Sequence, residues 1–185
     1  MRLFVAFEVG EEIRARLTEL GRELAAVAPS ARWVKPEKMH VTLAFLGEQP
    51  KARAGELAAA IAGACARHRA LVLRAVGGGA FGSPRRPKVL WLGLEGDTGA
   101  LAALQGELAK ALAPFGYVNE HGRYAAHLTL ARAKMPRGDA QLAACAERLK
   151  AVDLGQLAVT EVLLVESQGG QYTAVSRSPL PTGEG

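Results

Sequence analysis

The chain has 185 residues, of which 49% are hydrophobic, so it can bury a full core without disulfides or metals and is typical of a globular protein rather than a disordered or fibrous one. No apolar run approaches the roughly 20 residues of a transmembrane helix, and the first residues, MRLFVAFEVGEE, become acidic too soon for a secretory signal peptide, so we expect a cytoplasmic protein that does not bind membranes. The formal charge of +5 suits a polyanionic partner such as nucleic acid.

The first half of the chain alternates between strand and helix patterns. Residues 2–9 alternate and are rich in β-forming residues, which predicts a strand, and residues 10–28 carry apolar residues at helical spacing after two acidic ones, which predicts a helix. Pro36 interrupts residues 31–38, which are expected to form a loop or a short strand. The other predicted elements of this half are a strand at 39–47, a helix at about 51–68, a strand at about 70–76 and a loop rich in Gly, Pro and Arg at 77–87.

The same order of elements then begins again. The second half predicts a strand at 88–94, a helix at 98–116, an irregular segment, a strand at 126–133, a helix at about 139–150, a long strand near 157–166 and a tail from 178. A shift of 87 residues places Leu3–Phe7 on Leu90–Leu94 and helix 11–28 on helix 98–115 without a gap. Such a repeat predicts two similar α+β lobes related by an approximate two-fold axis, with equivalent strands facing each other.

One polar pair recurs in the two halves, in His40-Val41-Thr42-Leu43 and in His127-Leu128-Thr129-Leu130. Alternate side chains of a strand share a face, so each histidine lies on the same face as its threonine, and the apolar residues lie on the other. For two of the four histidines to have threonine two residues later is roughly a one-in-a-hundred coincidence. The repeat would bring both pairs together around one central cleft.

Two facing histidines indicate acid–base catalysis, because imidazole titrates near neutral pH and one ring can accept a proton while the other donates one. In-line displacement at phosphorus needs a base beside the incoming oxygen and an acid beside the leaving oxygen, on opposite sides. The hydroxyls of Thr42 and Thr129 could then donate hydrogen bonds to the non-bridging oxygens.

A metal site is the chemical alternative. Zinc takes three or four ligands, and neither motif strand carries a carboxylate or a thiol at ligand spacing. His68 ends a predicted helix and His121 lies in a polar loop, so neither completes a ligand set. Cys65 and Cys145 lie in Ala-rich helical patterns and are interpreted as small buried residues. We expect no metal and no other cofactor.

The motifs and their flanks, ARWVKPEKMHVTLAFLG, RRPKVLWLGL and AHLTLARAK, closely resemble the RNA 2′,3′-cyclic phosphodiesterases, formerly described as 2′-5′ RNA ligases, of the two-histidine phosphoesterase superfamily. The resemblance runs from Met1 to about Leu180. It implies a bilobal α+β fold, in which two antiparallel β-sheets related by a pseudo-two-fold axis are flanked by helices around a central cleft. We expect residues 1–180 to form this single domain and residues 181–185 to be a frayed tail.

The resemblance also implies metal-independent hydrolysis of an RNA terminal 2′,3′-cyclic phosphate to a 2′-phosphate. His40 would be the proton donor to the departing 3′ oxygen and His127 the proton acceptor that activates water, although the residues themselves do not distinguish the two roles. Thr42 and Thr129 would hold the phosphate, as would Arg132. Strict alternation points Arg132 away from His127, so that role requires a bulge or a strand end; the alternative is a surface charge.

Phe81, in the predicted loop 77–87, resembles the family position that stacks on the terminal base, and its alternative role is to pack the loop onto the core. Trp33 and Trp91 are assigned to packing. Basic residues expected near the mouth of the cleft, either to follow an RNA backbone or as a solvated loop, are Arg85, Arg86, Lys88, Lys134 and Arg137.

Two departures from the family pattern bear on substrate preference. Ala126 stands where the family usually has proline before the second histidine, and the residues around Tyr172 lack part of the usual pattern. The expected partners are RNA ends or cyclic-phosphate nucleotides, bound by a monomer. The alternative functions are a non-catalytic RNA-end binding module and a phosphodiesterase for another small cyclic phosphate, and reverse 2′-5′ ligation is expected at most as a minor activity.

Overall fold

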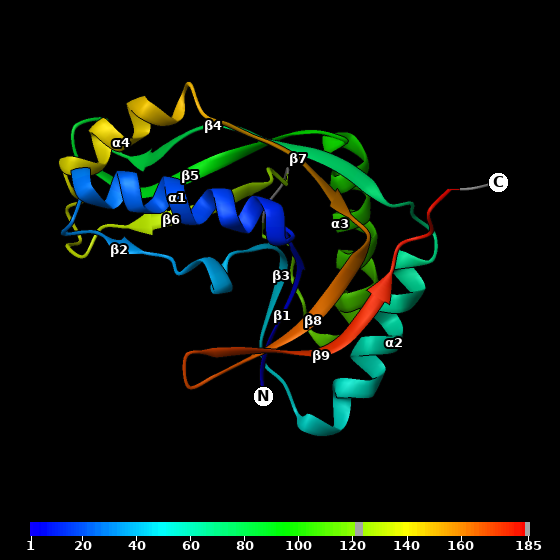
Figure 1. Ribbon diagram of the computed structural model, residues 1–185. Helices are drawn as coiled ribbons and strands as arrows, with labels where there is room; N and C mark the ends of the chain where they lie inside the picture. Colours follow the sequence, from blue (N-terminus) through cyan, green and yellow to red (C-terminus); the bar gives the residue numbers. More distant parts are fainter. Residues whose placement is uncertain (121–123, 184–185) are drawn as a thin grey trace.

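Two antiparallel β-sheets organise the chain in the computed structural model, which describes residues 1–120 and 124–183. The first sheet has the strand order β3-β1-β8-β9 and the second has the order β2-β6-β5-β4-β7 (Figure 1). The strands are β1 (Arg2–Glu8), β2 (Arg32–Trp33), β3 (His40–Glu48), β4 (Leu71–Gly82), β5 (Pro87–Gly96), β6 (His127–Arg132), β7 (Asp153–Val159), β8 (Glu161–Gln168) and β9 (Gln171–Pro179). The predicted α+β class with two antiparallel sheets is confirmed.

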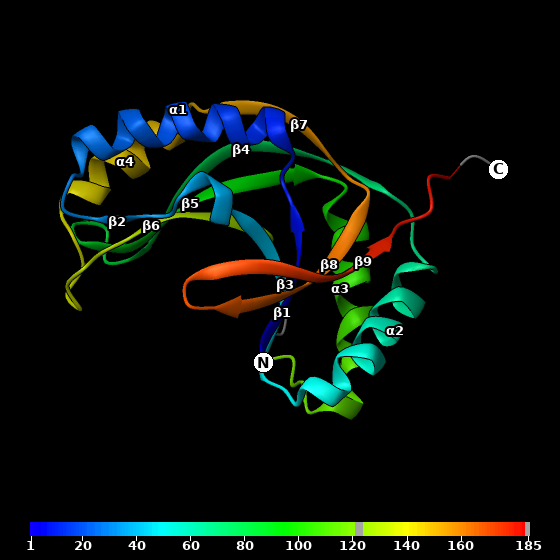
Figure 2. The same ribbon diagram turned by 60° about the horizontal axis from the view of Figure 1, so that its bottom comes forward.

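Helices flank both sheets. They are α1 (Glu11–Val27), α2 (Ala54–Cys65), α3 (Thr98–Leu112) and α4 (Gln141–Leu149), and single 3₁₀ turns span Pro36–Lys38, Lys51–Arg53 and Ala113–Phe115. In both views α1 lies against α4 beside the second sheet, whereas α2 lies against α3 beside the first (Figure 1, Figure 2). Each helix buries one apolar stripe, as the helical spacing predicts. None of the helices in the described residues combines the length and apolar character that a membrane crossing requires.

The two halves of the chain exchange a strand. The trio β3-β1-β8 of the first sheet has the same arrangement as the trio β6-β5-β4 of the second. Strand β4 comes from the first half but pairs with β5, and β8 comes from the second half but pairs with β1. Each sheet therefore needs strands from both halves, so neither half completes a sheet by itself.

The repeat is present in the pairing, with a register that differs from the predicted one. Val5 pairs with Ala44 in the first sheet, and Leu90 pairs with Ala131 at the corresponding place in the second. Leu90 therefore corresponds to Val5 and not to Leu3, so the predicted superposition of β1 on β5 is wrong by two residues. A strand pattern repeats every two residues, so a shift of two leaves the same faces apolar and cannot be detected from the sequence alone.

The predicted loop at 77–87 is wrong, because β4 continues to Gly82 before a short turn leads into β5. Gly79 pairs with Trp91, and a Cβ atom at Gly79 would stand 3.0 Å from the indole ring. Gly79 therefore leaves room for the Trp91 ring to lie across the strand. The sequence suggested instead that the glycines form a turn.

The predicted long strand at 157–166 is also wrong, because Thr160 divides it into β7 of the second sheet and β8 of the first. Strand β9 was not predicted, and it includes the first two residues of the segment interpreted as a tail. Leu180 is buried after it, and the carbonyl of Pro181 accepts a hydrogen bond from the backbone N–H of Ala70 over 2.8 Å. Residues 184–185 lie outside the described residues.

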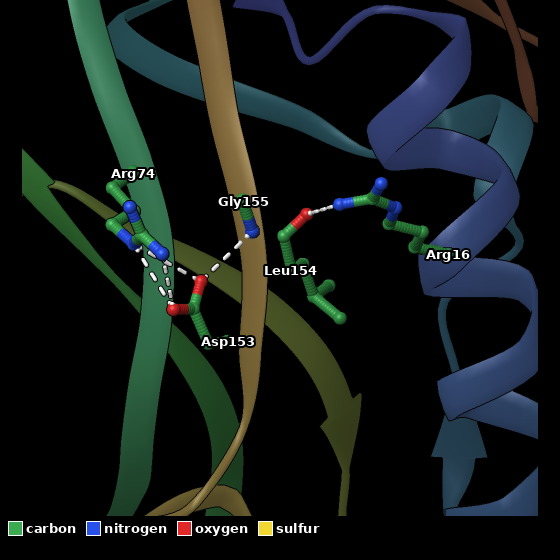
Figure 3. Close-up of polar contacts among 5 residues, drawn as sticks. All are labelled: Arg16, Arg74, Asp153, Leu154 and Gly155. Atoms are coloured by element: carbon green, nitrogen blue, oxygen red, sulfur yellow. Dashed lines mark hydrogen bonds and ion pairs between the residues drawn. The ribbon is translucent and has the colours of Figure 1, made fainter.

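Strand β7 is held from both sides (Figure 3). On one side the Arg74 guanidinium of β4 donates hydrogen bonds to the Asp153 carboxylate and lowers the pKa of that carboxyl. On the other side Arg16 of α1 donates to the carbonyl of Leu154. Gly155 has a φ of 93°, a backbone conformation that favours glycine, and a Cβ atom there would displace the Arg16 guanidinium, 2.7 Å away. These contacts fix α1 on the second sheet.

Candidate active site

Each motif histidine begins its strand and makes the same hydrogen bond. The Nδ1 atom of His40 lies 3.1 Å from the carbonyl oxygen of Lys38, and Nδ1 of His127 lies 3.1 Å from that of Ala125, in both cases two residues earlier. A carbonyl oxygen only accepts, so Nδ1 carries a proton in both rings. Nε2 is therefore the nitrogen that can accept or donate a proton in the reaction in each half.

A β-bulge follows the threonine in each motif strand. In β6, Trp91 pairs with Thr129 while Leu90 pairs with Ala131, so Leu130 is the extra residue. Leu130 and Ala131 are consequently both buried, and Arg132 is exposed. The bulge thus brings Arg132 to the face of His127 and Thr129, as the predicted phosphate-binding role of Arg132 required. We call this face of each sheet, which carries the histidine and threonine, the motif face.

Arg132 has a second arginine beside it. Its direct partner across β2 is Arg32, and both residues are exposed. Like charges opposite one another on paired strands repel, and an anion between them relieves the repulsion. The end of β6 is therefore suited to a phosphate group.

The surroundings of His40 combine a carboxylate with aromatic rings. Its side chain is only 8% exposed, and its Nε2 atom lies 3.8 Å from Oε1 of Glu8, which pairs with it across β1. The edges of Phe4 and Tyr172 contact the imidazole, at centroid distances of 6.3 and 5.7 Å. The carboxylate can form an ion pair with this ring when the ring is protonated.

The surroundings of His127 are aromatic. The ring of Phe81 meets the imidazole edge-on at 5.4 Å and stacks on Trp91 at 5.4 Å with an interplanar angle of 29°. Phe81 lies in strand β4 rather than in a loop, and 47% of its surface is exposed. Trp91, predicted to serve packing, packs over Gly79 and also contacts His127 at 6.2 Å. The two rings together form a flat surface next to this histidine.

Two residues that the sequence did not indicate, Tyr124 and Gln105, bind the first motif strand, β3. Strand β3 is the outer strand of its sheet, and its outward carbonyls are bound by side chains of the second half. The hydroxyl of Tyr124 donates to the carbonyl of Thr42 over 2.8 Å, and the amide of Gln105 donates to that of Leu43 over 3.3 Å. Gln105 is 3% exposed on α3. A polar residue among the apolar residues of this helix face could have indicated its role from the sequence.

The comparison with known families gives the same division of the chain. The family model described as LigT like Phosphoesterase matches residues 8–91 and again residues 92–173, so each match contains one His-x-Thr motif. The chain belongs to this family. Membership makes it a phosphoesterase of the two-histidine type, as the resemblance of the motifs implied.

Relatives in the family span most of the chain. An RNA 2′,3′-cyclic phosphodiesterase of Aeropyrum pernix is 31% identical over 152 residues, which cover 82% of this chain and 85% of that one. One of Thermotoga maritima is 34% identical over 137 residues, with 72% and 71% covered. Among solved structures, a Thermus thermophilus protein superposes with a TM-score of 0.80 at 27% identity over all of both chains. The structure of E. coli LigT complexed with 3′-AMP gives 0.73 at 25% identity over 97% of both.

The residues predicted to lie outside the site are placed as follows. Cys65 and Cys145 are buried free thiols, and burial raises the pKa of Cys65 to about 11. Over residues 1–120 and 124–183, no three His, Cys, Asp or Glu side chains gather as metal ligands, and His121 lies outside these ranges. Arg86, which was expected near the mouth of the cleft, donates to the carbonyl of Gly138 and therefore has a structural role.

Proposed function

We propose that this phosphoesterase hydrolyses the 2′,3′-cyclic phosphate at the end of an RNA to a 2′-phosphate, without a metal, using His40 as proton donor and His127 as proton acceptor. The observation that carries the proposal is the matching pair of Nδ1 hydrogen bonds, which leaves Nε2 of each imidazole for proton transfer. The names of the relatives, which are RNA 2′,3′-cyclic phosphodiesterases, support the substrate class.

In the proposed reaction, Nε2 of His127 takes a proton from water as the water oxygen attacks phosphorus. The bond between phosphorus and the 3′ oxygen breaks, and Nε2 of His40 gives its proton to that oxygen. Thr42 and Thr129, one step along each motif face, donate hydrogen bonds to the non-bridging oxygens. Arg132 binds the same phosphate, and Phe81 stacks on the terminal base.

Glu8 supports the assignment of the two roles. The carboxylate lies 3.8 Å from Nε2 of His40, whereas the neighbours of His127 are the rings of Phe81 and Trp91. A proton donor must present an N–H from Nε2, and a carboxylate at this distance can orient that group. The surroundings of the two histidines therefore differ, and we assign the proton donor to the first half.

The strand exchange supports treating residues 1–180 as a single catalytic unit. Each sheet takes strands from both halves, and Tyr124 and Gln105 bind the outer edge of β3. A separated half would present a motif strand on an incomplete sheet. We therefore expect neither half to be active alone.

The deciding experiment is hydrolysis of an oligoribonucleotide that ends in a 2′,3′-cyclic phosphate, with EDTA present, followed by identification of the product isomer. Many turnovers to a 2′-phosphate are the expected result. A 3′-phosphate product would reverse the choice of leaving oxygen, and loss of turnover in EDTA would contradict the metal-independent mechanism. Tight binding of this RNA without turnover would show that the protein is an RNA-end binding module and not an enzyme.

A further inference from the structure

A second aromatic surface lies on the motif face of the first sheet, next to His40. Phe45 pairs with Phe4 across β1, and their ring centroids are 6.2 Å apart. Tyr172 of β9 meets Phe4 at 5.1 Å and His40 at 5.7 Å. Phe45 is 73% exposed and Tyr172 is 41% exposed, so both present ring surface to solvent. The proposed hydrolysis of a single terminal nucleotide uses neither ring.

The position of Phe45 follows from the bulge in β3. Ala6 pairs with Thr42 while Val5 pairs with Ala44, so Leu43 is the extra residue and Phe45 emerges on the motif face. Phe45 therefore occupies the position in the first half that Arg132 occupies in the second, 87 residues later. One half offers a cation at this position and the other offers an aromatic ring.

A small apolar cluster supports this surface. Phe4 and Ala6 of β1 pack with Leu163 and Val165 of β8, apart from the main core and on the motif face. The cluster is buried beneath the exposed rings, so the rings rest on a fixed support. The ammonium group of Lys38 lies 5.7 Å from the centre of the Tyr172 ring and brings a positive charge to the edge of the surface.

We propose that Phe45 and Tyr172 bind a second nucleobase of the substrate, on the opposite side of the histidine pair from Phe81. This rests on the proposed function and narrows its substrate to RNA ends with two bases at the site, in preference to cyclic mononucleotides. Exposed aromatic rings stack on any base, and Lys38 is placed for a backbone phosphate. The second base belongs either to the penultimate nucleotide or to a nucleoside whose 5′ oxygen takes the place of water.

The test compares three ligands with the wild-type protein, Phe45→Leu and Phe45→Trp. The ligands are adenosine 2′,3′-cyclic phosphate, the dinucleotide ApA ending in a 2′,3′-cyclic phosphate, and 2′-5′-linked ApA. Phe45→Leu keeps an apolar side chain at an exposed position but removes the ring, and Phe45→Trp keeps a ring. If the second base is the penultimate one, the wild-type kcat/KM should be about 5- to 150-fold higher for the cyclic dinucleotide than for the cyclic mononucleotide, which is the range for stacking one base. Phe45→Leu should abolish this preference and Phe45→Trp should retain it.

The third ligand separates the two sources of the base. In 2′-5′-linked ApA the 3′-hydroxyl attacks phosphorus and the bond to the 5′ oxygen breaks; one imidazole takes the hydroxyl proton and the other protonates the 5′ oxygen, which yields a cyclic phosphate and adenosine. If only this ligand loses affinity in Phe45→Leu, the second base is that of the nucleoside bearing the 5′ oxygen. If only the cyclic dinucleotide does, it is the penultimate base.

Two results would overturn the proposal. Equal losses in Phe45→Leu for the cyclic mononucleotide and the cyclic dinucleotide would show that the terminal base uses this surface, and no loss for any ligand would show that no base does. Failure of the proposed function is a separate outcome, namely that the wild-type protein hydrolyses neither cyclic phosphate. In that case titration of the same ligands against wild-type protein and Phe45→Leu still decides whether a base stacks here.

Discussion

The hydroxyl of Tyr124 donates a hydrogen bond to the backbone carbonyl of Thr42 over 2.8 Å, and thereby joins the segment that leads into His127 to the strand that carries His40. Thr42 lies on the outer edge of its sheet, where a carbonyl has no strand partner. The bond spans 82 residues of sequence and links the first motif to the segment just before the second. The relative placement of the two imidazoles therefore depends on side chains as well as on the sheets.

Tyr124→Phe should lower kcat by about 2- to 10-fold, because it removes one hydrogen bond worth about 0.5–1.5 kcal/mol and keeps the buried ring. KM should change less than two-fold, since Tyr124 is proposed to position strands and not to touch the substrate. Steady-state kinetics on a cyclic-phosphate RNA test this, with Val118→Ala, an exposed residue of the same segment, as the control. A lower melting temperature with unchanged kcat would mean that the bond serves stability alone.

His40→Ala and His127→Ala should each lower turnover by about 10²- to 10⁴-fold, because each removes a proton carrier. Each histidine is the first residue of its strand, so its loss leaves the pairing of the strand in place and the circular dichroism spectrum should remain that of the wild-type protein. The double variant should be little worse than either single one, since the two rings act as a unit. Activity near the wild-type level in either single variant would refute the mechanism.

Arg132→Ala should raise KM and lower kcat, together costing about 10- to 100-fold in kcat/KM, because a charged hydrogen bond to phosphate is worth about 1.5–3 kcal/mol. Arg132→Lys should recover only part of this loss, since an ammonium group lacks the planar fork of guanidinium. Arg32→Ala, the cross-strand neighbour, is the matched control and should cost less. Equal losses in Arg132→Ala and Arg32→Ala would show that the two arginines share the phosphate, and no loss in Arg132→Ala would refute its phosphate contact.

Glu8→Gln should lower kcat by a few-fold, because it removes the carboxylate beside Nε2 of His40 and keeps the side-chain size. Glu8 is 42% exposed, so salt should screen its effect, and the gap between wild-type protein and variant should narrow from 50 mM to about 1 M salt. Rate measurements at both ionic strengths test this. An unchanged kcat at low salt would show that Glu8 does not assist His40 in the reaction.

The stability of the protein should fall between about pH 9 and pH 11 because of Cys65. Burial raises the pKa of this thiol from 9.0 to about 11, so over this range the unfolded chain loses the proton while the folded chain keeps it. The stabilising contribution is complete below pH 9 and is lost as pH rises through the folded pKa. The free energy of unfolding, measured in urea, should fall less between pH 8 and pH 10.5 for Cys65→Ala than for the wild-type protein. Equal losses would show that the thiol does not contribute.

The local pattern of the sequence was enough for several features. Apolar spacing predicted the strands β1 and β3, the four helices within a few residues, and the apolar and polar faces of the motif strands. The recurrence of His-x-Thr in two strand patterns identified the two motifs. The need for a bulge before Arg132 also followed from alternation, and the bulge is present.

What depended on contacts between distant residues was decided only by the tertiary structure. The glycines of β4 suggested a loop, but they make room for the ring of Trp91. That ring comes from the next strand, so this contact could not be read from the local pattern. The exchange of β4 and β8 between the sheets leaves no trace in a pattern of period two, because a strand has the same faces in either sheet. Tyr124 and Gln105 acquire their roles through hydrogen bonds that span 82 and 62 residues of chain, and Phe45 acquires its role through a bulge. Hydrogen bonds and stacking depend on where a side chain is placed in space, which composition and spacing do not fix.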